Sequence, residues 1–186
     1  MKRPNIAYRP GTLLALVLGA LWLGGLACGA DNKPLIALGA KVPSFEATTT
    51  SGQQVKFPAA YKGKVVLLDF WATWCGPCRA ELPNVVAAYQ RFHAQGFEVL
   101  GVSLDRANAA SQLAGFAQAN NMSWPQIYDG GWWQAEVAQK YGIQSIPRPI
   151  LVDGDTGVVL ADGPGARGEQ LVPAIQRALA AKKKTN

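Results

Sequence analysis

Cysteine and histidine are scarce in this chain, which has three cysteines and one histidine among 186 residues. Structural zinc sites use four such side chains, and Cys28, one of the four, lies in an apolar N-terminal segment. The composition therefore excludes a zinc finger or zinc ribbon. Any catalysis that needs a histidine would have to use His93.

An excess of charge of one sign is also missing from the body of the chain. The formal net charge is +6, but three cations lie within residues 1–9 and three more at 182–184. Without these six, 12 basic residues (18 less 6) stand against 12 acidic residues. A neutral body of this kind argues against a phosphate-binding face, so no nucleic-acid partner is expected.

The N-terminal segment has the pattern of an export signal. Residues 1–11 carry three cations and no acid, and residues 13–30 then run without a charge until Asp31. A cationic start followed by an apolar run directs a chain across the cytoplasmic membrane. Three outcomes stay open: cleavage after Ala30, lipidation of Cys28 within a lipoprotein-like Leu26-Ala27-Cys28-Gly29, or retention as a membrane anchor. In each, we expect the domain in the periplasm or on the extracytoplasmic face of a bacterial inner membrane.

Hydrophobic patterning beyond residue 30 predicts an α/β domain. We assign residues 31–43 to a lead-in linker, 44–181 to the domain and 182–186 to a basic tail. A hairpin is expected over 45–48 and 54–57 around Ser51-Gly52. Further strands are expected at 65–71, 97–104, 149–152 and 157–160, and helices at 76–95, 108–121, 132–141 and 168–181. Strands that alternate with helices specify a layered sheet.

Cys75 and Cys78 are the only cysteines of this domain. A bridge between them would close a very small loop and add little chain-entropy stabilisation, so the pair indicates redox chemistry or metal binding. Cys75 ends the turn between a predicted strand and a predicted helix, where the helix N-terminus stabilises a thiolate. We expect Cys75 to attack disulfides and Cys78, more buried, to resolve the mixed disulfide. Pro77 suits the first helical turn.

The run from Asp69 to Cys78, DFWATWCGPC, resembles the active-site segment of the thioredoxin superfamily. Residues 141–147, YGIQSIP, resemble its later segment that ends in a cis-proline. The hairpin, the continuation AELP at 80–83 and an extra unit near 104–128 are similar to the TlpA/ResA-like thiol-disulfide oxidoreductases of the AhpC/TSA-redoxin-like branch. The resemblance implies a thioredoxin-like three-layer α/β/α sandwich with an N-terminal β-hairpin and a central insertion.

This resemblance also implies roles for single residues. Pro147, in the cis form, would lie against the cysteines and leave the backbone of Ile146 for a substrate strand. Asp69 would accept a proton from Cys78 with a raised pKa, and Glu81 would tune the dithiol, although an acid in the first turn also favours a helix without any such role. The implied substrate surface comprises Trp74, Gly76, Pro77, Ile146 and Pro147. Arg148 and Pro149 depart from the family pattern, and Arg148 could bring a cation to the dithiol.

The leading functional prediction is an exported, membrane-tethered enzyme that reduces protein disulfides, for example in cytochrome c maturation. It would draw electrons from a membrane thiol carrier and need no cofactor or metal beyond the Cys75–Cys78 disulfide. One alternative is a thiol peroxidase, although Thr73 lies only two residues before Cys75, against three in the peroxidase pattern. The other is a copper chaperone that uses both thiolates as soft ligands.

Overall fold

The computed structural model describes residues 36–185, so the predicted export segment and Cys28 lie outside the described part. A five-stranded sheet forms its centre, with the strands in the order β5-β4-β3-β6-β7. Strands β3, β4 and β5 are parallel, and β6 and β7 are antiparallel to their neighbours. The strands are β3 (Val65–Trp71), β4 (Phe97–Ser103), β5 (Gln126–Ile127), β6 (Arg148–Asp153) and β7 (Val159–Asp162).

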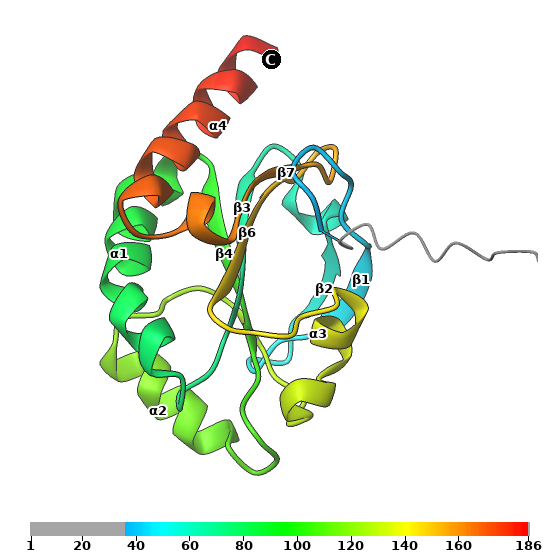
Figure 1. Ribbon diagram of the computed structural model, residues 1–186, viewed down its shortest axis with the longest axis vertical. Coiled ribbons are helices and arrows are strands. Elements are labelled where there is room, and N and C mark those ends of the chain that lie inside the picture. Colours follow the sequence, from blue (N-terminus) through cyan, green and yellow to red (C-terminus); the bar gives the residue numbers. More distant parts are fainter. Residues whose placement is uncertain (1–35, 186) are drawn as a thin grey trace, which may run out of the picture. The chain divides into compact units, whose positions relative to one another are not determined.

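Four α-helices cover the two faces of this sheet. Figure 1 shows α1, α2 and α4 on one side, and α3 with the β1–β2 hairpin on the other. This is the three-layer arrangement that the sequence predicts. The helices are α1 (Gly76–Phe92), α2 (Ala110–Ala119), α3 (Glu136–Lys140) and α4 (Leu171–Thr185), and the hairpin strands are β1 (Phe45–Thr48) and β2 (Gln54–Phe57).

Strand β3 is buried on both faces, and its side chains alternate between the two layers of the cover. The Phe70 ring contacts Tyr141 beside α3 at 5.5 Å between centroids. The next residue, Trp71, contacts Phe116 of α2 at 5.5 Å. Asp69 shares the face of Trp71, so a carboxyl group lies among the apolar contacts of β3 on the side where α1 begins.

Helix α1 follows β3 after a short turn because the local sequence favours a helix start there. Cys75 has an extended backbone and caps the helix, and Pro77 lies in the first turn, where its missing N–H costs nothing. Leu82, Val85 and Phe92 recur at helical spacing and are buried against the sheet. The turn and the buried stripe together fix the N-terminus of α1 at the carboxyl end of β3.

Residues on either side of the segment 44–181 contact β6, β7 and the turn between them. Residues of the lead-in segment pack on β7: Gly39 donates its N–H to the Val159 carbonyl at 2.9 Å, and Ile36 is buried. At the other end, Lys182 forms ion pairs with Asp153, at 3.1 Å, and with Asp155. Contacts of the fold therefore begin before residue 44 and continue beyond residue 181.

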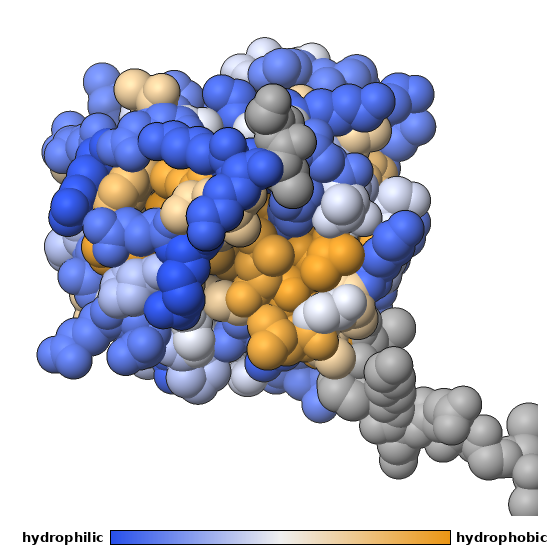
Figure 2. All heavy atoms as spheres, turned by 90° about the horizontal axis from the view of Figure 1, so that it is seen from above, coloured by the Kyte–Doolittle hydropathy of each residue, from blue (hydrophilic) through white to orange (hydrophobic). Residues whose placement is uncertain are grey.

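Figure 2 views the domain from the end opposite the start of α1 and shows an apolar area among hydrophilic side chains. No helix within residues 36–185 combines the length and the hydropathy that a membrane crossing requires.

Candidate active site

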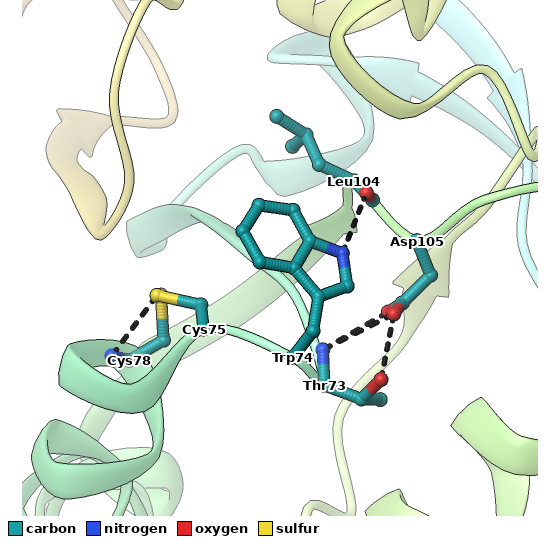
Figure 3. The surroundings of a disulfide bond; sticks show 6 residues. All are labelled: Thr73, Trp74, Cys75, Cys78, Leu104 and Asp105. Carbon is teal, nitrogen blue, oxygen red and sulfur yellow. Dashed lines mark hydrogen bonds between the residues drawn. A yellow bond between two sulfur atoms is a disulfide. The ribbon is translucent and has the colours of Figure 1, made fainter.

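The two cysteines lie at the N-terminus of α1 and are joined by a disulfide. Cys75 is the N-cap, and its Sγ accepts a hydrogen bond from the backbone N–H of Cys78 at 3.2 Å (Figure 3). After reduction, the same N–H and the positive end of the helix dipole would stabilise a thiolate on Cys75. The cap position therefore makes Cys75 the better nucleophile of the pair.

The expectation that Cys78 is the more buried cysteine is wrong. Cys75 is 4% exposed and Cys78 is 6% exposed, so both are buried to nearly the same extent. What distinguishes the two cysteines is their surroundings. Only Cys78 of the pair lines the small cavity between α1, β3 and the segment before β6.

This cavity brings a carboxyl group to the dithiol. Its volume is about 10 Å³, room for about one water molecule. Asp69, Cys78, Glu81, Pro147 and Arg167 are among the residues that line it. Burial raises the pKa of Asp69 to about 7, and the negative charge of Glu81 adds to the rise. At neutral pH, Asp69 can therefore both take up and release a proton.

Glu81 connects α1 to the segment before α4. Its Oε1 accepts the backbone N–H of Gly168 at 2.6 Å and the side-chain amide of Asn84 at 3.3 Å. Glu81 is thus held in place by the fold and also contributes charge to the cavity.

The Ile146–Pro147 peptide bond is cis. Pro147 lines the cavity beside Cys78, and Ile146 is half-buried against the core. Ile146 lies outside the strands, and its backbone makes no hydrogen bond within residues 36–185. The segment is therefore placed as the resemblance implies, next to the dithiol with a free backbone edge.

The cation expected near the dithiol from Arg148 is not among the residues that line the cavity. Arg148 forms an ion pair with Asp162 on β7 at 2.6 Å, because the register of β6 and β7 brings the two side chains together. Arg167, from the segment before α4, lines the cavity instead. Pro149 also lines it, opposite Asp69 in the β3–β6 register.

The residues around Cys75 form an exposed surface. Gly76 and Pro77 are exposed, and a Cβ at Gly76 would meet no atom within 4 Å. Trp74 is 47% exposed, and its indole N–H donates to the Leu104 carbonyl at 3.3 Å (Figure 3). The indole is thus fixed in orientation while one face stays open to solvent.

Sequence reasoning missed a buried carboxylate behind this turn. Asp105 is 2% exposed, and it accepts hydrogen bonds from the Thr73 hydroxyl at 2.6 Å and the Thr73 N–H at 3.1 Å (Figure 3). It also accepts the Ser103 hydroxyl at 2.7 Å. The signal was present: Asp105 follows β4, which is parallel to β3, and the carboxyl ends of parallel strands meet at one edge. Asp105 therefore anchors the segment that leads into Cys75.

His93, the one histidine of the sequence, lies away from the dithiol. His93 follows the C-terminus of α1, and its Nδ1 is 3.3 Å from a carboxylate oxygen of Glu98. No group of three or more Cys, His, Asp and Glu side chains in the described part of the chain is arranged to hold a metal ion.

Comparisons with known proteins agree with this geometry. Residues 38–161 match the AhpC/TSA family. The thiol-disulfide oxidoreductase ResA of Geobacillus kaustophilus is 31% identical over 152 residues, which are 82% of this chain and 83% of the relative. ResA of Bacillus subtilis is 28% identical over 160 residues, 85% of this chain and 84% of the relative. The thioredoxin domain of a thiol-disulfide oxidoreductase from Bacteroides vulgatus is 30% identical, with a TM-score of 0.67, and the match covers 77% of this chain and 99% of that one.

Proposed function

This chain belongs to the AhpC/TSA family and is a thiol-disulfide oxidoreductase of thioredoxin-like fold with a Cys75–Cys78 disulfide; on that premise, we propose that it reduces protein disulfides outside the cytoplasm. The observation that carries the proposal is the cavity in which Cys78 meets Asp69 and Pro147. It supports a role for Asp69 as proton acceptor of Cys78, and it brings Cys78 next to Pro147, which follows the free backbone of Ile146.

The first step is attack by Cys75. With the dithiol reduced, the Cys75 thiolate attacks one sulfur of a substrate disulfide, and the other substrate sulfur leaves as a thiolate. The backbone N–H of Cys78 and the helix N-terminus keep Cys75 ionised before attack. The backbone of Ile146 would pair with the substrate chain and align its disulfide with Cys75.

The second step is resolution by Cys78. Asp69 takes the proton of the Cys78 thiol, and the resulting thiolate attacks Cys75 in the mixed disulfide. The substrate sulfur bound to Cys75 then leaves as a thiolate and takes up a proton. Two electrons have passed from the enzyme to the substrate, and the enzyme holds the Cys75–Cys78 disulfide. An acid with a pKa of about 7 suits this transfer near neutral pH.

The N-terminal segment supports a location outside the cytoplasm. Its cationic start and apolar run support export, with the domain in the periplasm or on the outer face of the inner membrane. A membrane thiol carrier would reduce the disulfide again after each turnover. Apocytochromes, whose cysteines must be reduced before haem attachment, are our proposed substrate class. Export is tested by protease accessibility of the full chain in spheroplasts.

Trapping of the mixed disulfide tests the proposed mechanism. The Cys78→Ser variant should form a stable mixed disulfide with disulfide-bonded insulin, visible on a non-reducing gel. Cys75 attacks the insulin disulfide, and no second cysteine is present in the domain to resolve the product. The Cys75→Ser variant should form none, and the reduced wild-type chain should convert insulin to its thiol form. Failure of the wild-type chain to reduce insulin, or equal trapping by both variants, would overturn the proposal.

A further inference from the structure

Two loops beside Trp74 are joined into one unit. Arg106, in the loop after β4, forms an isolated antiparallel bridge with Gly131, in the loop after β5. The Tyr128 hydroxyl strengthens the junction, because it donates to the Arg106 carbonyl at 2.6 Å and accepts the Ala109 N–H at 2.9 Å. These contacts hold the Arg106 backbone in a fixed position relative to the second loop.

The second loop holds Trp132 in a strained, left-handed backbone conformation. Trp132 has a φ of 53° and is 37% exposed, although a bulky residue in the left-handed region is strained. The Asp129 carboxylate holds the turn, because it accepts the N–H of Gly131 at 2.8 Å and of Glu136 at 2.7 Å. A strained and exposed aromatic residue that the fold holds in place points to a role in binding.

Arg106 stacks on this tryptophan. Its guanidinium carbon lies 4.0 Å from the centroid of the Trp132 ring, which is a close cation–π contact. Within residues 36–185, no hydrogen bond or ion pair engages the guanidinium N–H groups of Arg106. Stacking fixes the plane of the guanidinium and leaves its donors at the edge. A planar acceptor with two oxygens, a carboxylate, is the group that such an edge binds best.

The arginine lies on a surface that leads to the dithiol. A groove of about 390 Å³ is lined by Thr73, Trp74, Arg106 and Gln112, among others. A series of tryptophan rings also connects Arg106 to the residue before Cys75: Trp132 is 6.3 Å from Trp133, and Trp133 is 6.1 Å from Trp74, measured between centroids. Trp74 directly precedes Cys75. An extended chain advances about 3.3 Å per residue, so a few residues of substrate can reach from Cys75 to Arg106.

We propose that Arg106, stacked on Trp132, is a specificity-determining residue that binds an acidic side chain of the protein substrate close to the attacked cysteine. This inference rests on the proposed function, since it assigns a substrate feature to the same dithiol. Asp105 also borders the groove, but its carboxylate is occupied by Thr73 and Ser103. Asp105 is also buried whereas Arg106 is exposed, so of these two charged side chains Arg106 is the one that a substrate side chain can contact.

Matched disulfide peptides test the assignment. Two peptide disulfides would differ only in glutamates or glutamines that flank the cysteine, and the full chain, reduced and in detergent micelles, would reduce each of them. We expect kcat/KM to be about fivefold higher for the glutamate peptide at low ionic strength, which is the upper range for an exposed ion pair. The preference should decrease at high salt.

Variants locate the preference. In Arg106→Gln, kcat/KM should be the same for the two peptides. Arg106→Lys should keep part of the preference for the glutamate peptide, and Arg106→Glu should prefer the glutamine peptide. Arg91→Gln is the matched control, because Arg91 also stacks on an aromatic ring, Phe92, but at the far end of α1. That variant should keep the wild-type ratio.

A neutral disulfide separates this inference from the proposed function. Equal rates on the two peptides, with normal reduction of 2-hydroxyethyl disulfide, would overturn the role of Arg106 and leave the reductase intact. A preference that survives Arg106→Gln would do the same. If the wild-type chain reduced neither the peptides nor 2-hydroxyethyl disulfide, the proposed function and this inference would both fail.

Discussion

Asp69 on β3 and Glu81 on α1 line the same cavity, so two carboxyl groups meet beside Cys78. The two residues come from different elements: Asp69 lies in the central strand β3, and Glu81 lies in α1, which packs over it. Removal from solvent is the main reason that the pKa of Asp69 rises to about 7, and the charge of Glu81 is the second.

Asp69 should make the oxidised protein less stable as the pH rises. Between the ordinary value of 3.8 and the folded value of about 7, the folded chain keeps a proton that the unfolded chain has released. The free energy of unfolding therefore falls across this range and levels off above pH 7. Urea denaturation from pH 4 to 9 measures it. Asp69→Asn should lack this fall and be more stable than the wild-type chain at pH 8; identical profiles of the two proteins would contradict the account.

Glu81→Gln should lower the pKa of Asp69 without releasing the loop. The glutamine keeps an oxygen for the Gly168 N–H but removes the negative charge that raises the Asp69 pKa. Because burial is the larger cause, the pKa should stay above 3.8. Carboxyl titration by NMR gives the value directly. Glu46→Gln, an exposed acid of the hairpin that pairs with Lys56, serves as the control, and an Asp69 pKa that is equal in both variants would refute the coupling.

Asp105→Ala should destabilise the domain by about 3 kcal/mol, because it leaves buried donors of Thr73 and Ser103 without an acceptor. Urea unfolding measures the loss. Asp129→Ala is the matched control: its exposed carboxylate also accepts two backbone N–H groups, and its loss should cost about 1 kcal/mol. If both variants lost the same free energy of unfolding, the buried hydrogen bonds of Asp105 would contribute no more to stability than the exposed ones of Asp129.

Hydrogen peroxide should be a poor substrate. The Thr73 hydroxyl donates its proton to Asp105, so it is not available to an oxygen of a peroxide near Cys75. We expect thiol loss from the reduced chain in peroxide to proceed no faster than from a simple dithiol. Rapid catalytic consumption of peroxide would instead favour the thiol peroxidase.

Much of this site could be predicted because its parts are local in sequence. The strand at 65–71, the capping Cys75 and the helix that follows are specified by a continuous apolar run, a cap and helical spacing. Long-range features were harder to predict. The pairing of Thr73 with Asp105, the stack of Arg106 on Trp132 and the place of Arg167 in the cavity lining each join segments that only the tertiary fold brings together.

The missed details share a physical cause. Burial of Cys75 depends on the tertiary packing around the helix start, which spacing does not report. Arg148 was expected near the dithiol from its place after Pro147, but the β6–β7 register gives it Asp162 as a partner. Strand β5 has two residues, too few for any periodic pattern to reveal.

The reduction potential of the Cys75–Cys78 couple tests the central claim most directly. The full chain in detergent would be equilibrated with glutathione or dithiothreitol redox buffers. The fraction of the protein with Cys75 and Cys78 in the reduced, dithiol form would then be measured at each buffer potential. A reductant of protein disulfides requires a low potential, so we expect a value near the ~−270 mV of thioredoxin. A value near the ~−120 mV of a strong periplasmic oxidant would contradict the account and make the chain a donor of disulfides.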